Sequence, residues 1–202
     1  MAGVLAAIIL AAGESARMGR PKALLPDPSG RPFVTRLAAT FAAAGVSDIV
    51  VVASAQEAAI SRALAPASLP VTPVVVTNPN PERGQLSSLW VGLDHAEPGG
   101  ADAVLVTLVD IPMVKVETVA YVIEAWQKHR PPIVRPAYGD RHGHPVLFDR
   151  SLYAELRRAP LDEGARAVVH AHEADLVNVA VDDEGCVIDV DTPDDYARLM
   201  EK

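Results

Sequence analysis

Three basic side chains lie within one short loop near the start of the sequence, and their types suit a chain of phosphates. Arg17, Arg20 and Lys22 alternate there with Gly13 and Gly19. Glycine permits positive φ and a close backbone approach, and cations offset the charge of phosphate oxygens. The loop therefore predicts a triphosphate site in which backbone N–H groups hold the oxygens and the cations stabilise a leaving pyrophosphate.

Two familiar phosphate loops do not match these residues. A Walker A loop continues from its second glycine to Lys and Ser or Thr, whereas Gly19 is followed by Arg20. The dinucleotide-binding pattern needs a glycine two residues after the first, whereas Ser15 stands two residues after Gly13. A surface turn with scattered basic residues is the simpler interpretation, and the cluster of three cations argues against it.

An aspartate ends a fully apolar run in the middle of the chain. Asp110 follows the run Ala103–Val109 directly. A carboxylate at the carboxyl end of a buried strand would lie at the edge of the sheet, within reach of the first loop. Mg²⁺ prefers oxygen ligands, usually one or two carboxylates together with phosphates and water. Asp110 is therefore a candidate magnesium ligand, and an ordinary turn aspartate is the alternative.

Two further carboxylates lie close together near the end of the chain. Asp189 and Asp191 are two residues apart, so a strand would place both on one face. Either one would complete a metal site with Asp110, and the sequence does not decide between them. Thr192 and Pro193 follow as a helix N-cap and a first-turn proline, so capping is the competing role for this segment.

A predicted helix start carries a third group of polar residues. Gly84 ends a loop that contains Asn78, and Ser87 and Ser88 occupy the first turn of the helix that follows. Free N–H groups at a helix N-terminus favour a phosphate or a base carbonyl. Serine capping explains the two serines equally well on their own.

The remaining candidates lie in the second half. His142 and His144 are two residues apart, which would suit a shared metal, but no third ligand follows at a recognisable spacing. Zinc is therefore disfavoured, and contact with solvent or substrate is the expected role of these histidines.

These residues must be positioned by alternating strands and helices. The predicted strands are Val4–Leu10, Asp48–Ala53, Val71–Val76, Ala103–Val109, Pro132–Arg135, His144–Phe148, Leu176–Ala180 and Val187–Val190. The predicted helices are Pro32–Ala44, Gln56–Leu64, Gln85–His95, Glu117–Lys128, Arg150–Arg157, Glu163–Ala171 and Pro193–Met200. Gly45 is expected to end the first helix and Asp162 to cap the sixth.

The order of these elements indicates an α/β fold with a mostly parallel central sheet covered by helices on both faces. Runs that are apolar throughout are typical of strands buried on both faces. The strand-like pieces over 139–148 predict a small antiparallel excursion. Ligands bind beyond the carboxyl ends of the strands in such sheets, which is where the first loop and Asp110 lie.

Composition narrows the class of protein. A length of 202 residues, half of them apolar, suits one domain over 1–202. A net charge of −8 argues against a nucleic-acid partner. Cys186 is the single cysteine, so an intramolecular disulfide is excluded and a cytoplasmic protein is expected. The apolar run Val4–Ala12 is too short to span a bilayer, so no membrane association is expected.

The first loop resembles the signature of the molybdenum-cofactor nucleotidyltransferase superfamily, through the run Leu10-Ala11-Ala12-Gly13-x-Ser15-x-Arg17-Met18-Gly19-x-Pro21-Lys22-x-Leu24-Leu25. The resemblance is greatest to the CTP:molybdopterin cytidylyltransferases, and the GTP-using guanylyltransferases are similar. The alanine pair before Gly13 favours CTP over GTP. Four more blocks resemble the family in the expected order, at Asn78–Leu93, Asp110–Pro112, Arg141–Phe148 with Asp162–Arg166, and Asp189–Asp195.

The resemblance implies a GT-A-like, Rossmann-related, three-layer domain that uses Mg²⁺ and transfers a nucleoside monophosphate to a phosphorylated acceptor, molybdopterin. Arg17, Lys22 and Asp110 would be catalytic, and Asp110, Asp189 and Asp191 would supply metal ligands. The implied nucleotide-binding residues are Leu10, Ala11, Ala12, Gly13, Lys22, Asn78, Gly84, Ser87 and Ser88. The implied acceptor-binding residues are His142, Gly143, His144 and Arg166.

Three alternatives remain open from the sequence. Asp162-Glu163 departs from the Gly-Asp-Lys that is usual in the family, so a sugar phosphate, methylerythritol phosphate or another small phosphate ester is a possible acceptor. Related cytidylyltransferases of isoprenoid and sugar metabolism have a similar loop near the start of their sequences. The last alternative is a nucleotide-binding accessory protein that serves a client molybdoenzyme and has no turnover of its own.

Overall fold

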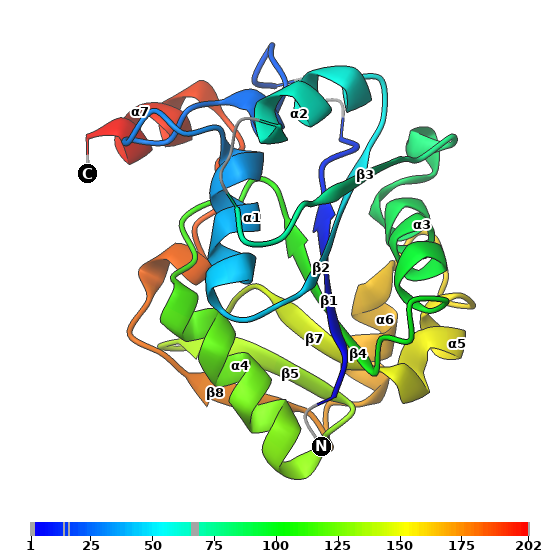
Figure 1. The fold of residues 1–202 in the computed structure, drawn as a ribbon. Coiled ribbons are helices and arrows are strands. Elements are labelled where there is room, and N and C mark those ends of the chain that lie inside the picture. Colours follow the sequence, from blue (N-terminus) through cyan, green and yellow to red (C-terminus); the bar gives the residue numbers. More distant parts are fainter. Residues whose placement is uncertain (1–2, 14, 16, 66–68, 202) are drawn as a thin grey trace.

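The structure is a computed structural model that describes residues 3–13, 15, 17–65 and 69–201. Glu14 and Ala16 of the first loop lie outside these residues. An eight-stranded sheet has the strand order β3-β2-β1-β4-β7-β5-β6, and β8 pairs with β5 (Figure 1). The strands are β1 Leu5–Leu10, β2 Asp48–Ala53, β3 Val74–Thr77, β4 Ala103–Leu108, β5 Ile133–Tyr138, β6 Arg141–His142, β7 Val146–Asp149 and β8 Val177–Ala180.

The sheet has a parallel half and a mixed half. Strands β3, β2, β1 and β4 run parallel, and Ile8 of β1 lies opposite Val50 of β2 and Val106 of β4. β7 is antiparallel to both β4 and β5, β6 forms a hairpin with β5, and β8 is parallel to β5. The mostly parallel α/β sheet and its antiparallel excursion are thus confirmed.

The described chain has seven α-helices, of which six cover the two faces of the sheet and the last, α7, lies beyond the sheet and packs against the start of α1 (Figure 1). They are α1 Phe33–Ala43, α2 Glu57–Leu64, α3 Gln85–Ala96, α4 Val116–His129, α5 Tyr153–Leu156, α6 Ala165–Ala171 and α7 Pro193–Met200. Gly45 follows α1 at φ 88°, and Thr192 begins α7 with a reciprocal capping box to Asp195, as the sequence predicts. No helix of the described residues is long and apolar enough to cross a membrane.

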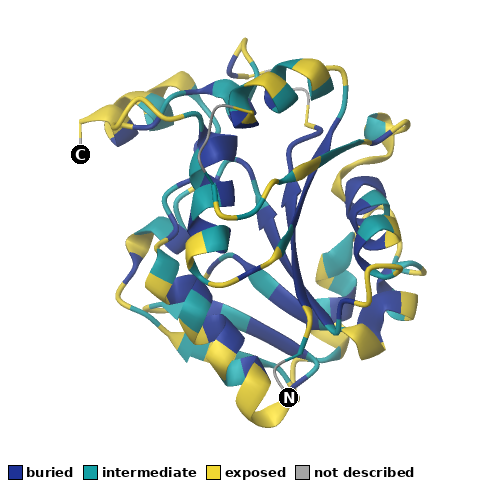
Figure 2. Cartoon of the chain, viewed as in Figure 1, coloured by how far each residue is buried: buried dark blue, intermediate teal, exposed yellow. Residues whose placement is uncertain are grey.

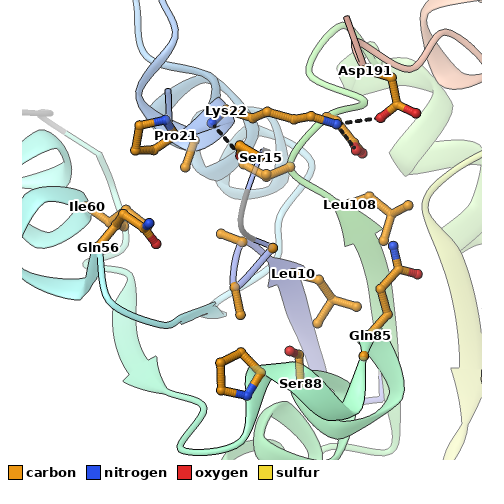
Figure 3. A pocket seen from close by; sticks show the side chains of 18 of the residues that line it. Leu10, Ser15, Pro21, Lys22, Gln56, Ile60, Gln85, Ser88, Leu108 and Asp191 are labelled. Atoms are coloured by element: carbon orange, nitrogen blue, oxygen red, sulfur yellow. Dashed lines mark hydrogen bonds and ion pairs between the residues drawn. The ribbon is translucent and has the colours of Figure 1, made fainter. Parts of the chain in front are cut away.

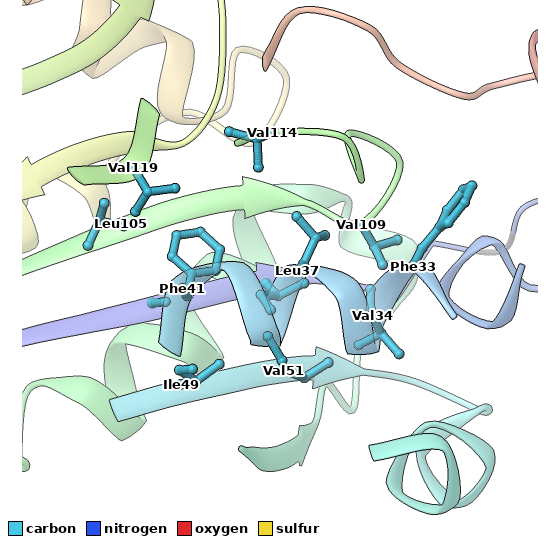
Figure 4. Close-up of a cluster of buried hydrophobic side chains, with 14 of the residues drawn as sticks. Phe33, Val34, Leu37, Phe41, Ile49, Val51, Leu105, Val109, Val114 and Val119 are labelled. Atoms are coloured by element: carbon cyan, nitrogen blue, oxygen red, sulfur yellow. The ribbon is translucent and has the colours of Figure 1, made fainter. Parts of the chain in front are cut away.

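Alternation along β1 divides the core into two clusters. Ala7 and Ile9 pack on the side of α1, α2 and α4, whereas Ala6 and Ile8 pack on the side of α3, α5 and α6. All six residues of β1 are buried, and the central strands form a buried band between more exposed helices (Figure 2). On the first side, Val34, Leu37 and Phe41 of α1 lie in the buried cluster against the sheet (Figure 4). This packing fixes where the loops after β1 and β4 begin.

The structure differs from the sequence prediction in three elements. Residues 187–190 form no strand, because Val190 N donates a single bond to the Asp110 carbonyl and no strand ladder develops. Asp162 does not cap the sixth helix, because α6 begins only after Gly164 and has no side-chain cap. Residues 150–157 divide into a 3₁₀ turn, Arg150–Leu152, and the short helix α5.

A buried ion pair connects the chain after the first loop to the chain after β4. Asp27 is fully buried and accepts hydrogen bonds from Ser29, the Arg31 backbone N–H and Arg36 Nη1. Arg36 Nε also donates to the Pro112 carbonyl at 3.0 Å. Burial alone would raise the pKa of Asp27, but these hydrogen bonds hold it below its ordinary value.

Replacing Asp27 with asparagine is expected to lower the free energy of unfolding at pH 7 by about 2 kcal/mol, because a buried charged acceptor is lost. The pKa of Asp27 is lowered by folding, so its stabilisation is present at neutral pH and disappears as the pH falls through the lowered value. Urea unfolding at pH 7 and pH 3 would therefore show a smaller difference between wild type and Asp27→Asn at pH 3. An equal difference at both values would contradict this assignment.

Candidate active site

The first loop leaves β1 and closes on Ser15. The N–H groups of Met18 and Gly19 donate to the Ser15 carbonyl, and the Lys22 N–H donates to Ser15 Oγ at 3.1 Å. Ser15 has φ 53° and Gly19 has φ 70°, so both occupy the left-handed region. Gly13 does not, so the predicted positive φ is confirmed only for Gly19. No atom of the described residues lies within 4 Å of a Cβ built on Gly13, which leaves room for a ligand beside its backbone.

Lys22 meets two carboxylates that are distant in sequence. Its Nζ lies 2.9 Å from Asp110 Oδ2 and 2.5 Å from Asp191 Oδ1 (Figure 3). Arg17 Nη2 lies 3.0 Å from the other oxygen of Asp191, although the Arg17 side chain remains 71% exposed. The structure therefore gathers the basic loop, the end of β4 and the segment before α7 at one edge of the sheet.

Lys22 and Asp191 each stabilise the ionised form of the other. Burial lowers the pKa of Lys22, but the hydrogen bonds and charges of Asp191 and Asp110 outweigh it and raise this pKa above its ordinary value. The hydrogen bond from Lys22 lowers the pKa of Asp191, and the charges of Lys22 and Arg17 lower it further. At neutral pH the group therefore presents two cations beside carboxylate oxygens.

Asp110 retains an oxygen that can accept a ligand. Oδ1 is buried and has no hydrogen-bond partner among the described residues, whereas Oδ2 binds Lys22. A buried carboxylate oxygen without a partner is costly, and a hard cation is a suitable partner for it. No three His, Cys, Asp or Glu side chains of the described chain form a metal site alone. The donor set therefore fits a Mg²⁺ ion that is shared with substrate oxygens.

The structure distinguishes between the two late carboxylates. Asp191 lines the same cavity as Asp110, whereas Asp189 is exposed and lines a separate cavity beside Met113 and Leu199. The expectation that both share a strand face is wrong, because residues 187–190 form no strand. The structure accordingly offers Asp110 and Asp191 to a metal, and Asp189 lies outside this group.

A cavity of about 420 Å³ opens above the carboxyl ends of β1 and β4 (Figure 3). Its polar lining includes Lys22, Asp110 and Asp191. Of the predicted nucleotide-binding residues, those that line it are Leu10, Ala11, Ala12, Gly13, Lys22, Gly84 and Ser88. Its volume and its cations suit the triphosphate and sugar of a nucleotide.

Asn78 and Ser87 do not line this cavity. The amide nitrogen of Asn78 donates to the hydroxyls of Ser87 and Ser88 at 2.9 Å each, and its oxygen accepts from the Asn80 N–H. Asn78 is 3% exposed and Ser87 4%. Their side chains make internal bonds that hold the start of α3, so the structure does not place them in the cavity, and direct contact with the nucleotide stays a prediction. They support the segment that carries Ser88.

A second cavity of about 430 Å³ adjoins the first on the side of β7 and α6. All four predicted acceptor-binding residues line it, namely His142, Gly143, His144 and Arg166. Arg135 and His170 line it as well, so its lining contains two arginines and three histidines. Arg135 is fixed by a 2.8 Å bond from Nε to Asn178 Oδ1. Glu163 is its one acidic lining residue.

His144 is held as a neutral ring. Burial lowers its pKa below the ordinary value, and the Val106 carbonyl and the charge of Asp110 offset this only in part. Nδ1 lies 3.3 Å from that carbonyl oxygen, which can only accept, so Nδ1 carries the proton. Nε2 therefore presents a lone pair that can receive an N–H or O–H group.

Gly143 is required by close packing. A Cβ on it would lie 2.4 Å from the Cys186 carbonyl oxygen and 2.7 Å from Sγ. The neighbouring His144 N–H donates to the same carbonyl at 2.8 Å. The sequence explains Gly143 by the room that an acceptor needs. The structure adds a second reason, which is close packing against the segment that leads to Asp191.

Polar lining residues that were not selected from the sequence include two glutamines, an arginine and a histidine. Gln56 and Gln85 line the first cavity, and Gln85, Arg135 and His170 line the second. Gln56 follows the carboxyl end of β2, so the rule that ligands bind beyond strand ends would have found it. Arg135 and His170 come together only through the pairing of β5 with β7 and β8, for which the sequence carries no local signal.

Comparison with known proteins agrees with this geometry. A family model described as "MobA-like NTP transferase domain" matches residues 7–176. The probable molybdenum cofactor guanylyltransferase of Rhodopirellula baltica is 34% identical over 130 residues, 64% of this chain and 59% of that protein. The nicotine blue oxidoreductase of Paenarthrobacter nicotinovorans is 34% identical over 205 residues, 96% of this chain and 95% of that protein.

A solved structure agrees over the whole chain. The crystal structure of Rv0371c from Mycobacterium tuberculosis H37Rv in complex with manganese matches with a TM-score of 0.78 and 29% identity, and covers 100% of both chains. The resemblance stated for the first loop is confirmed, because the family model extends over most of the sequence. The chain belongs to the family of MobA-like NTP transferase domains.

Proposed function

We propose that this nucleotidyltransferase uses Mg²⁺ to transfer CMP from CTP to the phosphate of molybdopterin in the cytoplasm. One observation supports this most directly: Lys22, Asp110 and Asp191 meet in a cavity that adjoins a second cavity lined by two arginines and three histidines. The first is suited to a nucleotide and the second to an anionic acceptor. Two adjoining sites are what a transfer between two bound substrates requires.

The residues of the chain would act mainly by positioning and by charge. The loop through Gly13 holds the phosphates, and Lys22 and Arg17 offset the charge on the departing pyrophosphate. An acceptor phosphate oxygen attacks the α-phosphorus in line and forms the new P–O bond. The bond from the α-phosphorus to the oxygen that bridges to the β-phosphate breaks, and pyrophosphate leaves with that electron pair. Mg²⁺ held by Asp110 and Asp191 would neutralise charge on the phosphates.

CTP is proposed from the alanine pair Ala11-Ala12 before Gly13 and from Asp189 and Asp191, because the similar block of the guanylyltransferases has Asn at the acidic positions. GTP is the second candidate, because a relative at 34% identity is named as a guanylyltransferase. Ser88 is the hydroxyl nearest the start of α3 that lines the nucleotide cavity, so it is proposed to contact the nucleotide.

Pyrophosphate release from CTP, GTP, ATP and UTP would test this proposal, each with molybdopterin and with or without Mg²⁺. We expect release only with both acceptor and metal, and a kcat/KM for CTP at least about tenfold above that for GTP. A preference for GTP would make the chain a guanylyltransferase. Sugar phosphates and methylerythritol phosphate form the acceptor controls, and faster release with either would reassign the acceptor. Tight nucleotide binding without any product would instead indicate an accessory protein.

A further inference from the structure

Among the residues that the structure describes, one polar side chain lines both cavities. The residues that line both cavities are Leu10, Gln85 and Leu108. Reacting atoms must approach to about 3–3.5 Å before transfer, so the nucleotide phosphorus and the acceptor oxygen must meet where the cavities join. Leu10 and Leu108 offer only apolar contact at that junction. Gln85 is therefore the lining residue there whose side chain can hydrogen-bond to both substrates.

The local backbone directs Gln85 to this place. Gln85 is the first residue of α3 and follows Gly84, which has φ 85° and ψ −174°. That conformation is essentially restricted to glycine, so the turn that begins α3 depends on Gly84. Figure 3 shows the Gln85 side chain extending from the start of α3 beside Leu108. The side chain is exposed to the cavities and is free to meet a ligand.

The chemistry of an amide suits this junction. Glutamine carries two N–H donors and one acceptor oxygen and has no charge. Both groups that meet there are phosphates, so their approach brings negative charges together. Two N–H groups can donate to one oxygen of each phosphate and reduce this repulsion, whereas a carboxylate in the same place would increase it.

We propose that Gln85 is a catalytic residue, whose amide donates one N–H to a non-bridging oxygen of the nucleotide α-phosphate and the other to the acceptor phosphate. This inference rests on the proposed nucleotidyl transfer and adds to it the group that brings the two phosphates together. Gln85 would act in the transfer step itself, because its amide would contact the nucleotide in one cavity and the acceptor in the other.

The other glutamines of the chain provide matched controls. Gln56 lines the nucleotide cavity and not the acceptor cavity, and Gln127 is exposed on α4 away from both. Steady-state kinetics would be measured for Gln85→Ala, Gln85→Glu, Gln56→Ala and Gln127→Ala, and thermal unfolding would confirm that each variant folds.

We expect Gln85→Ala to lower kcat ~10–100-fold, below the usual effect of a fully enclosed donor, with each KM changed less than about threefold. Gln85→Glu should lower kcat further, because its charge repels both phosphates. Gln56→Ala should raise the KM of the nucleotide alone, and Gln127→Ala should match wild type. A folded Gln85→Ala with the kcat of wild type, or a Gln85→Glu more active than Gln85→Ala, would overturn the inference. A wild-type chain without turnover would overturn the proposed function as well. Failure of the proposed function therefore shows in the wild-type chain, whereas failure of the Gln85 inference alone shows only in the variants.

Discussion

Replacement of Lys22 by alanine is expected to lower kcat by ~10²–10³-fold, the usual effect of removing one preorganised donor at a site of developing charge. Lys22 Nζ lies within hydrogen-bond distance of two carboxylates and lines the nucleotide cavity. Its side chain is 12% exposed, so water cannot readily replace its charge. The measurement is the rate of pyrophosphate release with saturating CTP, Mg²⁺ and acceptor.

Two control variants distinguish the loss of the Lys22 charge from a general loss of structure. Lys22→Met keeps the apolar stem and removes the charge, so it should lose as much activity as Lys22→Ala while its unfolding curve stays closer to that of wild type. Lys128→Ala removes an exposed lysine from α4 and should retain full activity. Near-complete pyrophosphate release by Lys22→Met would exclude the proposed role of the ammonium group.

Replacement of Asp110 by asparagine is expected to lower kcat/KM by ~10³-fold at any Mg²⁺ concentration, because a bound metal ion supplies several kcal/mol of charge stabilisation. The amide keeps the shape of the side chain but removes the charge from its unpartnered oxygen, Oδ1. Binding of Mn²⁺ in the presence of nucleotide, followed by electron paramagnetic resonance, would give a readout that does not depend on turnover. We expect this binding to weaken in Asp110→Asn.

Asp189 provides the matched control for this prediction. It is exposed and lines a cavity apart from the site, so Asp189→Asn should leave both kcat/KM and Mn²⁺ binding unchanged. Asp191→Asn should weaken both, because Asp191 contacts Lys22 and Arg17. If Asp189→Asn were the defective variant and Asp191→Asn the normal one, the assignment of the second carboxylate would be reversed.

The sequence predicts the parallel half of the fold well because its signals are local. β1, β2 and β4 are short and almost entirely apolar, with Asp48 and Thr107 as the polar exceptions. The position of each strand fixes the edge at which its following loop emerges. That is why the contact between Lys22 and Asp110, 88 residues apart, could be anticipated before any coordinates. The same reasoning succeeded for the cap of α7, where Thr192 and Pro193 carry the whole signal.

The failures concern residues whose roles depend on distant partners. Val190 is fully buried and apolar, so it resembles a strand residue, yet it packs in the core without a neighbouring strand. Asn78 is predicted to contact the nucleotide, and the sequence gives no sign of the three internal bonds that its side chain makes. The choice of Asp191 over Asp189 likewise depends on where one irregular segment crosses the loop after β4, because Val190 bonds to the Asp110 carbonyl there.

The contact between Lys22 and Asp191 joins positions 169 residues apart. Tyr196 of α7 strengthens the same connection, because its hydroxyl donates to the Pro26 carbonyl and its ring packs against Phe33. During synthesis the glycine loop therefore emerges well before the acidic residue that completes its site. Loss of the segment from 189 onward would remove Asp191 from the site and, with Val190 and Leu199, two buried side chains from the core cluster beside α1, so the site and the core depend on the same late segment.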